Sequence, residues 1–331
     1  MKDPEAARRF IPVRRLVPLL LTLTACQPRS GDGPVECIAP ANAGGGWDLT
    51  CRAIGRVLSE LDLVTGTVRV TNMPGAGGGV AFAHVVTRRE GDPSVVVAAS
   101  PATTLRLAQG QYGPLNERQV RWVGALAAEY GVLAVREDAP WRDLDALIAA
   151  WRENPGAVVT AGVSAVAGQD HVKVMLLARA AGIDPRRIRY VPFDGGGEAL
   201  SALLGGFIHV FTGDASEIAG QVEAGRVRPL TVFAPNRLGG PLADVPTSGE
   251  FGYPVEWVTW RGFYVPSDLS PDTYDTWVRR LAIVARSEEW ERVRTTYRLE
   301  PFVVLGADFE AFVQRQVETL RALSREIGLL R

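Results

Sequence analysis

Two glycine-rich turns most constrain the fold of this chain, because each stands between an apolar run and a helical pattern. The first turn, at 44–48, follows Cys37-Ile38-Ala39, and the second, at 72–79, follows the alternating run 67–71. Glycine lets the backbone approach a ligand, and the first N–H groups of a helix lack intrahelical acceptors and carry partial positive charge. Two such turns side by side would hold an anion without needing any Lys or Arg.

Strand and helix patterns alternate along the chain, which predicts layers of α/β structure. Apolar residues with the spacing of one helix face indicate helices at 54–61, 144–151, 174–181 and 309–320. Apolar or alternating runs indicate strands at 95–97, 131–135, 158–160, 189–191, 207–211 and 230–233.

The strand expected at 132–135 has the character of a crossing between two domains, and a second crossing is expected between Phe233 and Trp257. We therefore expect a discontinuous first domain, at 35–134 and 238–331, and a central second domain at 135–237. Ligands of open α/β sheets bind at the carboxyl ends of the strands, so the site is expected in the cleft where the two domains face each other.

The N-terminus has the pattern of an export signal. Arginines at 8, 9, 14 and 15 precede an apolar stretch at 16–23 that is too short to span a bilayer. Leu23-Thr24-Ala25-Cys26 resembles the bacterial lipobox, so we expect a lipoprotein signal peptide at 1–25, lipidation of Cys26 and a flexible tether at 26–34. The alternative is an ordinary secretory cleavage site with an incidental cysteine.

Charge and histidine usage argue against several classes of protein. Lys plus Arg total 36 and Asp plus Glu total 37, which gives no reason to expect nucleic acid as a partner, so any ligand charge must be recognised locally. The three histidines, His84, His171 and His209, lie far apart without the spacing of paired metal ligands. We expect neither a metal nor a cofactor.

Cys37 and Cys51 are the cysteines that remain after Cys26. Cys37 would start the first strand, and Cys51 would lie one turn into the helix that runs back along it. Their separation could close to disulfide range, and an exported protein is in the right redox compartment. We favour a disulfide, worth about 3 kcal/mol in the chain-entropy model. The alternative is two buried free thiols.

The candidate ligand contacts in the first domain are mostly backbone N–H groups, those of Gly46, Trp47, Ala76, Gly77 and Gly78. Trp47 could also form an apolar wall or belong to the core. Asp48 would repel an anion, so we interpret it as the N-cap that fixes its loop, with contact to a ligand hydroxyl as the alternative. Ser100 follows a strand, and Tyr130 lies near the expected hinge.

In the second domain, Gly195, Gly196 and Gly197 precede a helical pattern and could present N–H groups to the other end of the ligand. His171 could donate a hydrogen bond near a helix start, although a lone histidine is more often structural. Asp214 lies just past a strand and could accept from a ligand hydroxyl, but a helix cap is the preferred interpretation.

Several segments together resemble one family, the extracytoplasmic receptors of tripartite tricarboxylate transporters (the Bug/TctC type). The similarity is collinear from Glu36 to Pro266, and the Cys37/Cys51 pair is closest in appearance to the citrate-binding branch. The segments that carry it are 36–41, 44–51, 72–78, His171 with its Gly168-Gln169 turn, 181–184, 191–197, 202–206 and 244–247.

The resemblance implies a two-domain periplasmic-binding-protein fold, type II-like, that closes on citrate or another tricarboxylate or dicarboxylate. It also implies partners, namely the membrane permease subunits of a transporter driven by an ion gradient. We expect an exported, lipid-anchored monomer. Two departures from the family pattern are Trp47, where many relatives carry Ser or Thr, and the segment 164–170, which is less polar than expected.

Two other functions are alternatives to a transport receptor. A lipid-anchored sensor for a signalling system would share the same pocket and differ only in the partner that detects the closed state. An exported enzyme is disfavoured, because Val80 stands where the dinucleotide fingerprint needs its third glycine and no Gly-Lys-Ser/Thr phosphate loop is present. The segment 162–166 likewise lacks the closing glycine of a hydrolase nucleophile elbow. We therefore expect no enzymatic activity.

Overall fold

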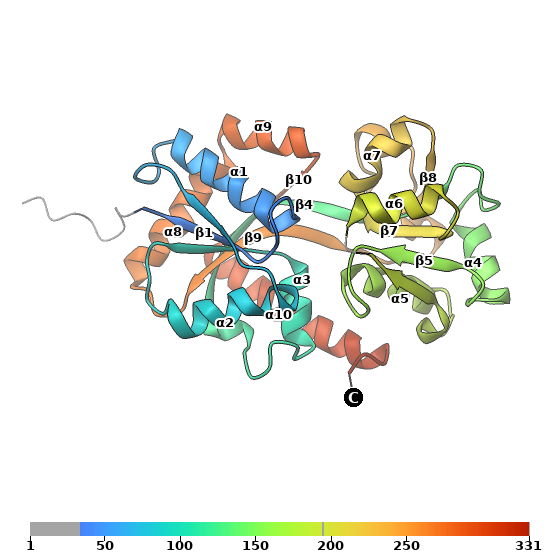
Figure 1. Cartoon of the computed structure of the whole chain (residues 1–331), viewed down its shortest axis with the longest axis horizontal. Helices are drawn as coiled ribbons and strands as arrows, with labels where there is room; N and C mark the ends of the chain where they lie inside the picture. Colours follow the sequence, from blue (N-terminus) through green and yellow to red (C-terminus); the bar gives the residue numbers. More distant parts are fainter. Residues whose placement is uncertain (1–33, 194, 331) are drawn as a thin grey trace, which may run out of the picture.

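The computed structural model describes residues 34–193 and 195–330. The expected signal peptide at 1–25, the lipidation site Cys26 and all but the last residue of the tether at 26–34 lie outside these residues. The described chain forms two α/β domains, the first from both ends of the chain and the second from its middle (Figure 1). This confirms the expected α/β, two-domain fold.

The first domain consists of β1 (Glu36–Ala39), α1 (Gly46–Glu60), β2 (Arg69–Asn72), α2 (Gly79–Arg88), β3 (Val95–Ala99), α3 (Pro101–Ala108), β9 (Val258–Pro266), α8 (Pro271–Ala285), α9 (Glu288–Tyr297), β10 (Glu300–Leu305) and α10 (Gly306–Glu326). The second consists of α4 (Leu144–Glu153), β5 (Val159–Gly162), α5 (Gln169–Ala180), β6 (Arg189–Pro192), α6 (Gly196–Leu204), β7 (Val210–Asp214), α7 (Ala215–Glu223) and β8 (Val227–Phe233). Both domains share β4 (Val120–Arg136).

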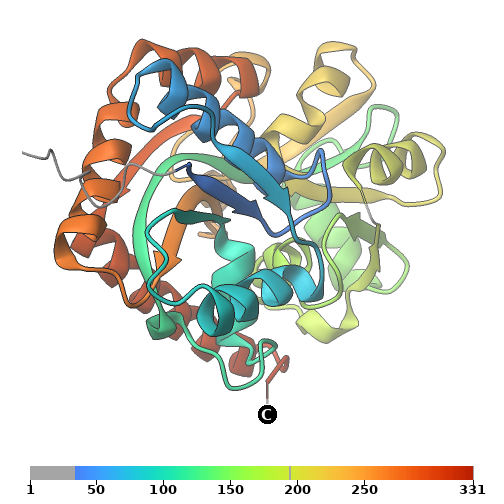
Figure 2. The same ribbon diagram turned by 60° about the vertical axis from the view of Figure 1, so that its left-hand side comes forward.

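The strand β4 joins the sheets of the two domains, which follow the order β2-β1-β3-β9-β4-β7-β5-β6. Its first part pairs with β9 and β10, and its last part, from Gly131, pairs with β7 and β8. The change of partner falls between Tyr130, opposite Val258, and Gly131, opposite Asp214 and Phe233. The strand is visibly curved as it passes from one sheet to the other (Figure 2).

Alternating side chains of the first sheet supply two cores, because successive strand residues point to opposite faces. Cys37 and Val96 belong to the cluster that contains buried side chains of α1, α8 and α9. Ile38 and Val97 belong to the cluster on the other face, with side chains of α2, α3 and α10. Helices therefore cover both faces of the sheet, which leaves the carboxyl ends of its parallel strands as the open edge.

The second domain follows the same rule. Leu133 packs with apolar side chains of α4 and α5, while its neighbour Val132 packs with those of α6 and α7. The strand expected at 207–211 is displaced in the structure, where β7 spans 210–214. Gly205 and Gly206 form a turn before it, and Phe207 is exposed instead of lying in the sheet.

Cys37 of β1 and Cys51 of α1 form a disulfide, with their Cα atoms 5.6 Å apart. Both residues are fully buried, in the core that α1 forms with β1 and β3. Ile54, Val57 and Leu58 extend the buried face of α1 along the same core. The disulfide therefore ties the strand before the first glycine turn to the helix after it.

The segment after β8 packs on the second domain. Leu242 and Val245 lie in one cluster with Val132, and Thr247 forms a bridge to Val232 of β8. The Trp257 N–H donates to the Phe233 carbonyl at 2.8 Å. The expected boundary at 237/238 remains a prediction, and these contacts favour a boundary closer to Trp257.

The long last helix, α10, packs on α3 and β4. Near its end, Glu326 forms an ion pair with Arg179 of α5, so this helix also reaches the second domain. Among residues 34–193 and 195–330, no helix has the length and apolar character needed to cross a membrane.

Candidate functional site in the cleft between the domains

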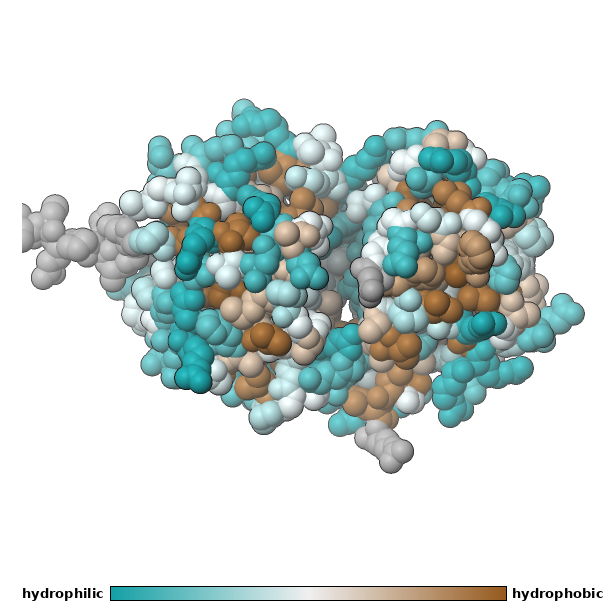
Figure 3. Space-filling model, viewed as in Figure 1, coloured by the Kyte–Doolittle hydropathy of each residue, from teal (hydrophilic) through white to brown (hydrophobic). Residues whose placement is uncertain are grey.

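A cavity of about 810 Å³ lies between the domains, where Figure 3 shows the surface indented. Residues at the N-termini of four helices line it: Gly46 of α1, Ala102 of α3, Gln169 of α5 and Ser216 of α7. Parallel strands lead into these helices, so the cavity lies at the carboxyl ends of the strands, where ligands of open α/β sheets bind.

The first glycine turn places the open end of α1 in the cavity. Its N-cap, Gly45, has no side chain to accept the first N–H groups of the helix, and Gly46 and Trp47 line the cavity. The backbone of this turn can therefore donate to an anion, as the sequence predicts.

Asp48 is not the N-cap of α1, which corrects one expectation. It lies in the first turn of the helix, is 2% exposed, and accepts hydrogen bonds from Gly44 N, Arg52 Nε and Asn72 Nδ2, all at 2.9 Å. The bonds from Arg52 and the two other donors lower its pKa to about 2, against the effect of burial. Asp48 does fix the loop, but from inside the helix, because glycine supplies the extended backbone that the cap position needs.

The second glycine turn has four consecutive residues with positive φ, from Gly75 to Gly78. Gly77 lines the cavity, and its carbonyl accepts a hydrogen bond from Tyr112 Oη at 2.7 Å. A Cβ on Gly78 would lie 2.9 Å from the same hydroxyl and 3.4 Å from the Trp47 ring. Ala76 and Gly78 shape the turn without lining the cavity.

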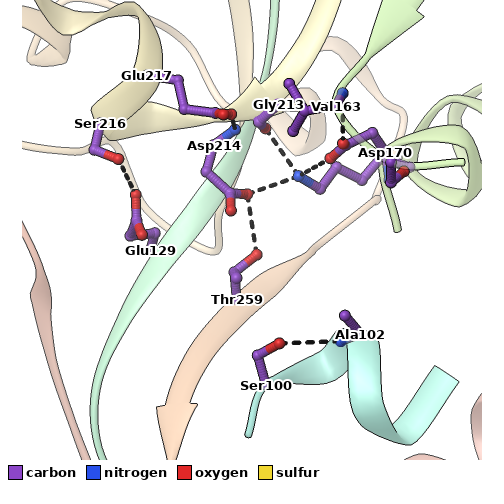
Figure 4. A network of polar contacts seen from close by, with 12 residues as sticks. Ser100, Ala102, Glu129, Val163, Asp170, Gly213, Asp214, Ser216, Glu217 and Thr259 are labelled. Atoms are coloured by element: carbon purple, nitrogen blue, oxygen red, sulfur yellow. Dashed lines mark hydrogen bonds and ion pairs between the residues drawn. The ribbon is translucent and has the colours of Figure 1, made fainter. Parts of the chain in front are cut away.

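The side chains of Ser100 and Trp47 are hydrogen-bonded to each other at the cavity wall. Ser100 is the N-cap of α3, and its Oγ accepts from Ala102 N at 3.3 Å and from Trp47 Nε1 at 3.2 Å (Figure 4 shows the first bond). Both residues line the cavity. Trp47 is thus fixed in orientation by a hydrogen bond.

Two arginines that sequence analysis missed stand beside the two glycine turns. A Cβ built on Gly46 would lie 2.5 Å from Nη1 of Arg261, and one built on Gly77 would lie 3.1 Å from Nε of Arg106. Both arginines line the cavity. The one feature of the sequence that could have indicated Arg261 is its position within an otherwise apolar strand.

A buried network of charged groups forms the floor of the cleft (Figure 4). Lys173 of α5 is 0% exposed, and its Nζ donates to Asp170 at 2.9 Å, to the Gly213 carbonyl at 2.9 Å and to Asp214 at 2.7 Å. Burial lowers the pKa of Lys173, but the two carboxylates outweigh burial and raise it above its ordinary value. Lys173 was also missed, because nothing in the sequence shows that α5 is buried on this side.

The same network crosses from one domain to the other. Thr259 of β9 donates to Asp214 at 3.0 Å, and Ser216 of α7 donates to Glu129 of β4. Glu129 also accepts from Arg261. Asp214 is the N-cap of α7, as preferred, and it lines the cavity as well.

Glu217 completes the start of α7, since its carboxylate accepts from Asp214 N at 2.7 Å. It lines the cavity beside Asp214. Burial, followed by repulsion from Asp214 and Asp170, raises the pKa of Glu217 to about 8. The surroundings of Glu217 therefore favour its protonated form over its charged form.

The other predicted residues lie beside the cavity and do not line it. His171 is buried, its ring stacks on Tyr190, its Nδ1 accepts from Ala167 N at 3.0 Å, and burial lowers its pKa to about 4. Tyr130 lines a smaller cavity of about 260 Å³, which shares Glu129 and Ser216 with the main one. Gly195, Gly196 and Gly197 begin α6, and a Cβ on Gly196 would lie 2.8 Å from Glu217 Oε1. These ligand contacts remain predictions.

Within the described residues, no group of three or more His, Cys, Asp or Glu side chains could hold a metal ion. The carboxyl groups of the cleft are instead engaged with Lys173, Arg261 and hydroxyl or N–H donors. Hydrogen bonds and charge pairs are therefore the interactions that these carboxyl groups make.

Comparison with known proteins identifies the family. The model of the tripartite tricarboxylate transporter family receptors matches residues 56–329. The chain belongs to this family. It is thus a solute-binding receptor of a periplasmic family, and the family resemblance seen in the sequence is confirmed.

Individual relatives agree with this assignment. BugT of Bordetella pertussis is 25% identical over 303 residues, 89% of each chain. A protein encoded in the tcbD-tcbE intergenic region of Pseudomonas sp. strain P51 is 28% identical over 235 residues, 70% of this chain and 68% of the relative. Among solved structures, R. palustris Rpa4515 with adipate is similar with a TM-score of 0.77 at 23% identity, covering 89% of this chain and 97% of that one.

MatC from Rhodopseudomonas palustris with bound malate is also similar, with a TM-score of 0.72 at 19% identity. The match covers 88% of the receptor and 98% of MatC. At these identities the two structures show that the fold is shared.

Replacing Lys173 by methionine tests the buried network of the receptor. We expect Lys173→Met to lower the free energy of unfolding by about 3–5 kcal/mol at pH 7, because Asp170 and Asp214 lose their buried cation. Urea unfolding followed by tryptophan fluorescence measures this change. The control is Arg186→Met, which removes an exposed ion pair with Asp184 and should cost less than about 1 kcal/mol. Equal losses in the two variants would contradict the prediction.

The raised pKa of Glu217 predicts a pH dependence of stability. Between its ordinary value of 4.5 and about 8, the folded receptor keeps the Glu217 proton and the unfolded chain releases it. The free energy of unfolding should therefore fall as pH rises through this window, by at most about 1.4 kcal/mol per pH unit for one group. Glu217→Gln should show a smaller fall between pH 5 and pH 8 in urea unfolding.

The control for this variant is Glu198→Gln, which changes an exposed residue of α6. Its pH profile should run parallel to that of the unchanged receptor. A Glu217→Gln profile with the same slope as the control would show that Glu217 is ionised in the fold.

Proposed function

We propose that this receptor captures a carboxylate between its two domains and delivers it to the permease of a tripartite tricarboxylate transporter. The observation that carries the proposal is the open N-terminus of α1 in a cavity of about 810 Å³ between the domains. Malate and adipate, bound by structural relatives, are carboxylates of the expected size. Citrate is the specific ligand that we propose, with other tricarboxylates and dicarboxylates as the wider class.

The available contacts are sufficient for physiological affinity. A hydrogen bond to a charged group contributes about 1.5–3 kcal/mol, and a micromolar dissociation constant represents about 8 kcal/mol. Three or four bonds from the glycine turns to carboxylate oxygens therefore account for much of the binding energy. The groups that we propose as donors are the N–H groups of Gly46, Trp47 and Gly77.

Two contacts bridge the domains at the rims of the cleft and support closure on the ligand. Gln109 Nε2, after α3, donates to the Ala167 carbonyl at 2.9 Å, and Arg298, after α9, pairs with Glu223 of α7 at 3.0 Å. A ligand that binds the closed form more tightly shifts the receptor towards it. We propose that the closed monomer is the form that docks on the permease.

Calorimetric titration with citrate, malate, glutamate and sulfate tests the proposed ligand class. We expect micromolar binding of a carboxylate and at least a tenfold loss of affinity in Gly77→Asp, because the new carboxylate would lie in the cavity and repel the ligand. Sulfate tests whether any anion is enough.

The control variant is Gly66→Asp. Gly66 also has positive φ, but a side chain there meets nothing within 4 Å and it does not line the cavity. The two variants therefore carry the same kind of backbone strain and the same added charge. Binding of none of the carboxylates would contradict the proposed function, and equal affinities in the two variants would contradict the proposed position of the pocket.

We also propose that a lipid on Cys26 anchors the receptor to a membrane after cleavage before this residue. The support is the sequence Leu23-Thr24-Ala25-Cys26 at the end of an export signal. In cells fed labelled palmitate, the receptor should incorporate label, and Cys26→Ala should abolish incorporation. Persistent label in the variant, or an unlabelled wild type, would rule out this anchor.

A further inference from the structure

Among the described residues, three arginines line the cavity, and two of them, Arg106 and Arg261, lie beside the glycine turns. Asp214 is paired with Lys173, Glu129 with Arg261, and Arg298 with Glu223. Glu217 accepts a hydrogen bond from a backbone N–H. Beside the glycine turns, the positive charge that can meet a ligand is therefore on Arg106 and on the donors of Arg261 that Glu129 does not use.

Arg261 is only partly satisfied by Glu129. One terminal nitrogen of its guanidinium donates to Glu129, while its Nε is buried and has no partner among the described residues. The guanidinium also lies against Gly46, where the N–H groups of α1 carry partial positive charge. Two positive groups this close repel each other, and an anion bound beside both offsets the repulsion. A carboxylate at this point would accept from both.

Arg106 has no carboxylate partner in the described part of the chain. The polar partner of its guanidinium there is Gln111 Oε1, and the Arg106 side chain lies over Gly77 in the cavity wall. Burial lowers the pKa of Arg106, because desolvation disfavours its charged form. An arginine presents a planar fork of donors that matches a carboxylate.

We propose that Arg261 and Arg106 each bind one carboxylate of the ligand, and that Arg106 selects ligands with at least two carboxylates over monocarboxylates. The first carboxylate lies beside both Arg261 and Gly46 at the cavity wall, and the second lies beside Arg106 and Gly77. This inference rests on the proposed function, and it adds the two side chains that set the substrate class.

Titration of matched ligands tests the inference. Malate and adipate are compared with 3-hydroxybutyrate and hexanoate, in which a methyl group replaces one carboxylate, and citrate is included as the tricarboxylate. The wild-type receptor should bind at least one of the three polycarboxylates tenfold or more tighter than either monocarboxylate. Arg106→Gln should remove most of this preference while it leaves the affinity for monocarboxylates within about twofold.

The second variant combines Arg261→Gln with Glu129→Gln, so that neither partner of the buried pair is left as an unpaired charge. It should weaken monocarboxylates and polycarboxylates by similar factors, because it removes the site of the first carboxylate. Arg56→Gln is the control, since Arg56 lies on the exposed face of α1 outside the cavity. Thermal unfolding of each variant establishes that it is folded.

The outcomes separate the inference from the proposed function. If wild type binds none of the carboxylates, both are overturned. If wild type binds polycarboxylates but Arg106→Gln behaves like Arg56→Gln, or if Arg106→Gln weakens both ligand types equally, only the inference is overturned. Equal affinity of the wild type for matched polycarboxylates and monocarboxylates would likewise overturn only the inference.

Discussion

Both domains depend on one continuous strand, β4, which pairs within the first sheet up to Tyr130 and within the second from Gly131. A side chain at Gly131 would lie 2.9 Å from Lys173 Cδ and from Phe233 Cδ2, so the junction has no room for any other residue. Because hydrogen bonds hold β4 on both sides of the junction, any motion between the domains must pivot near this residue and near Trp257, where the chain returns. The cavity lies directly beside this pivot. A ligand in the cavity therefore contacts residues next to the point about which the domains move.

The buried charges at the pivot are better understood as a device that sets orientation than as a source of stability. Burying an ion pair removes two charges from water, and the free-energy cost of this desolvation is roughly as large as the gain from their attraction. The bonds from Lys173 to Asp214 and from Thr259 to Asp214 nevertheless have fixed directions, and the second crosses the domain junction. Glu129 extends this connection, because it accepts from Ser216 in the second domain and from Arg261 in the cavity. A ligand at Arg261 would therefore act on a group that already joins the domains.

Sequence patterns predict the features of the fold that depend on interactions between residues close together in the chain. The helix at 54–61, the two glycine turns and the cap at Asp214 follow from periodicity and backbone preference, and the structure contains them. Asp48 was misplaced because its carboxylate bonds to Asn72, a residue of the other turn, and that contact exists only in the folded chain. Arg261 and Lys173 could not be assigned roles for the same reason, since their partners come from strands and helices distant in sequence. A charged residue inside an otherwise apolar strand or helix is the sequence feature that indicates a contact of this long-range kind.

Trp47 lies between the two glycine turns, each of which has an arginine beside it. Its position is consistent with two separate carboxylate positions in the cavity. It is the second residue of α1, its ring packs against Gly78 of the second glycine turn, and its Nε1 donates to Ser100. The indole thus lies between the turns, at a position where family resemblance leads us to expect the smaller Ser or Thr. Gly46 with Arg261 lies at the turn that carries the indole, and Gly77 with Arg106 lies at the turn against which the ring packs. In the proposed binding mode, each of the two carboxylates therefore meets one glycine turn and the arginine beside it.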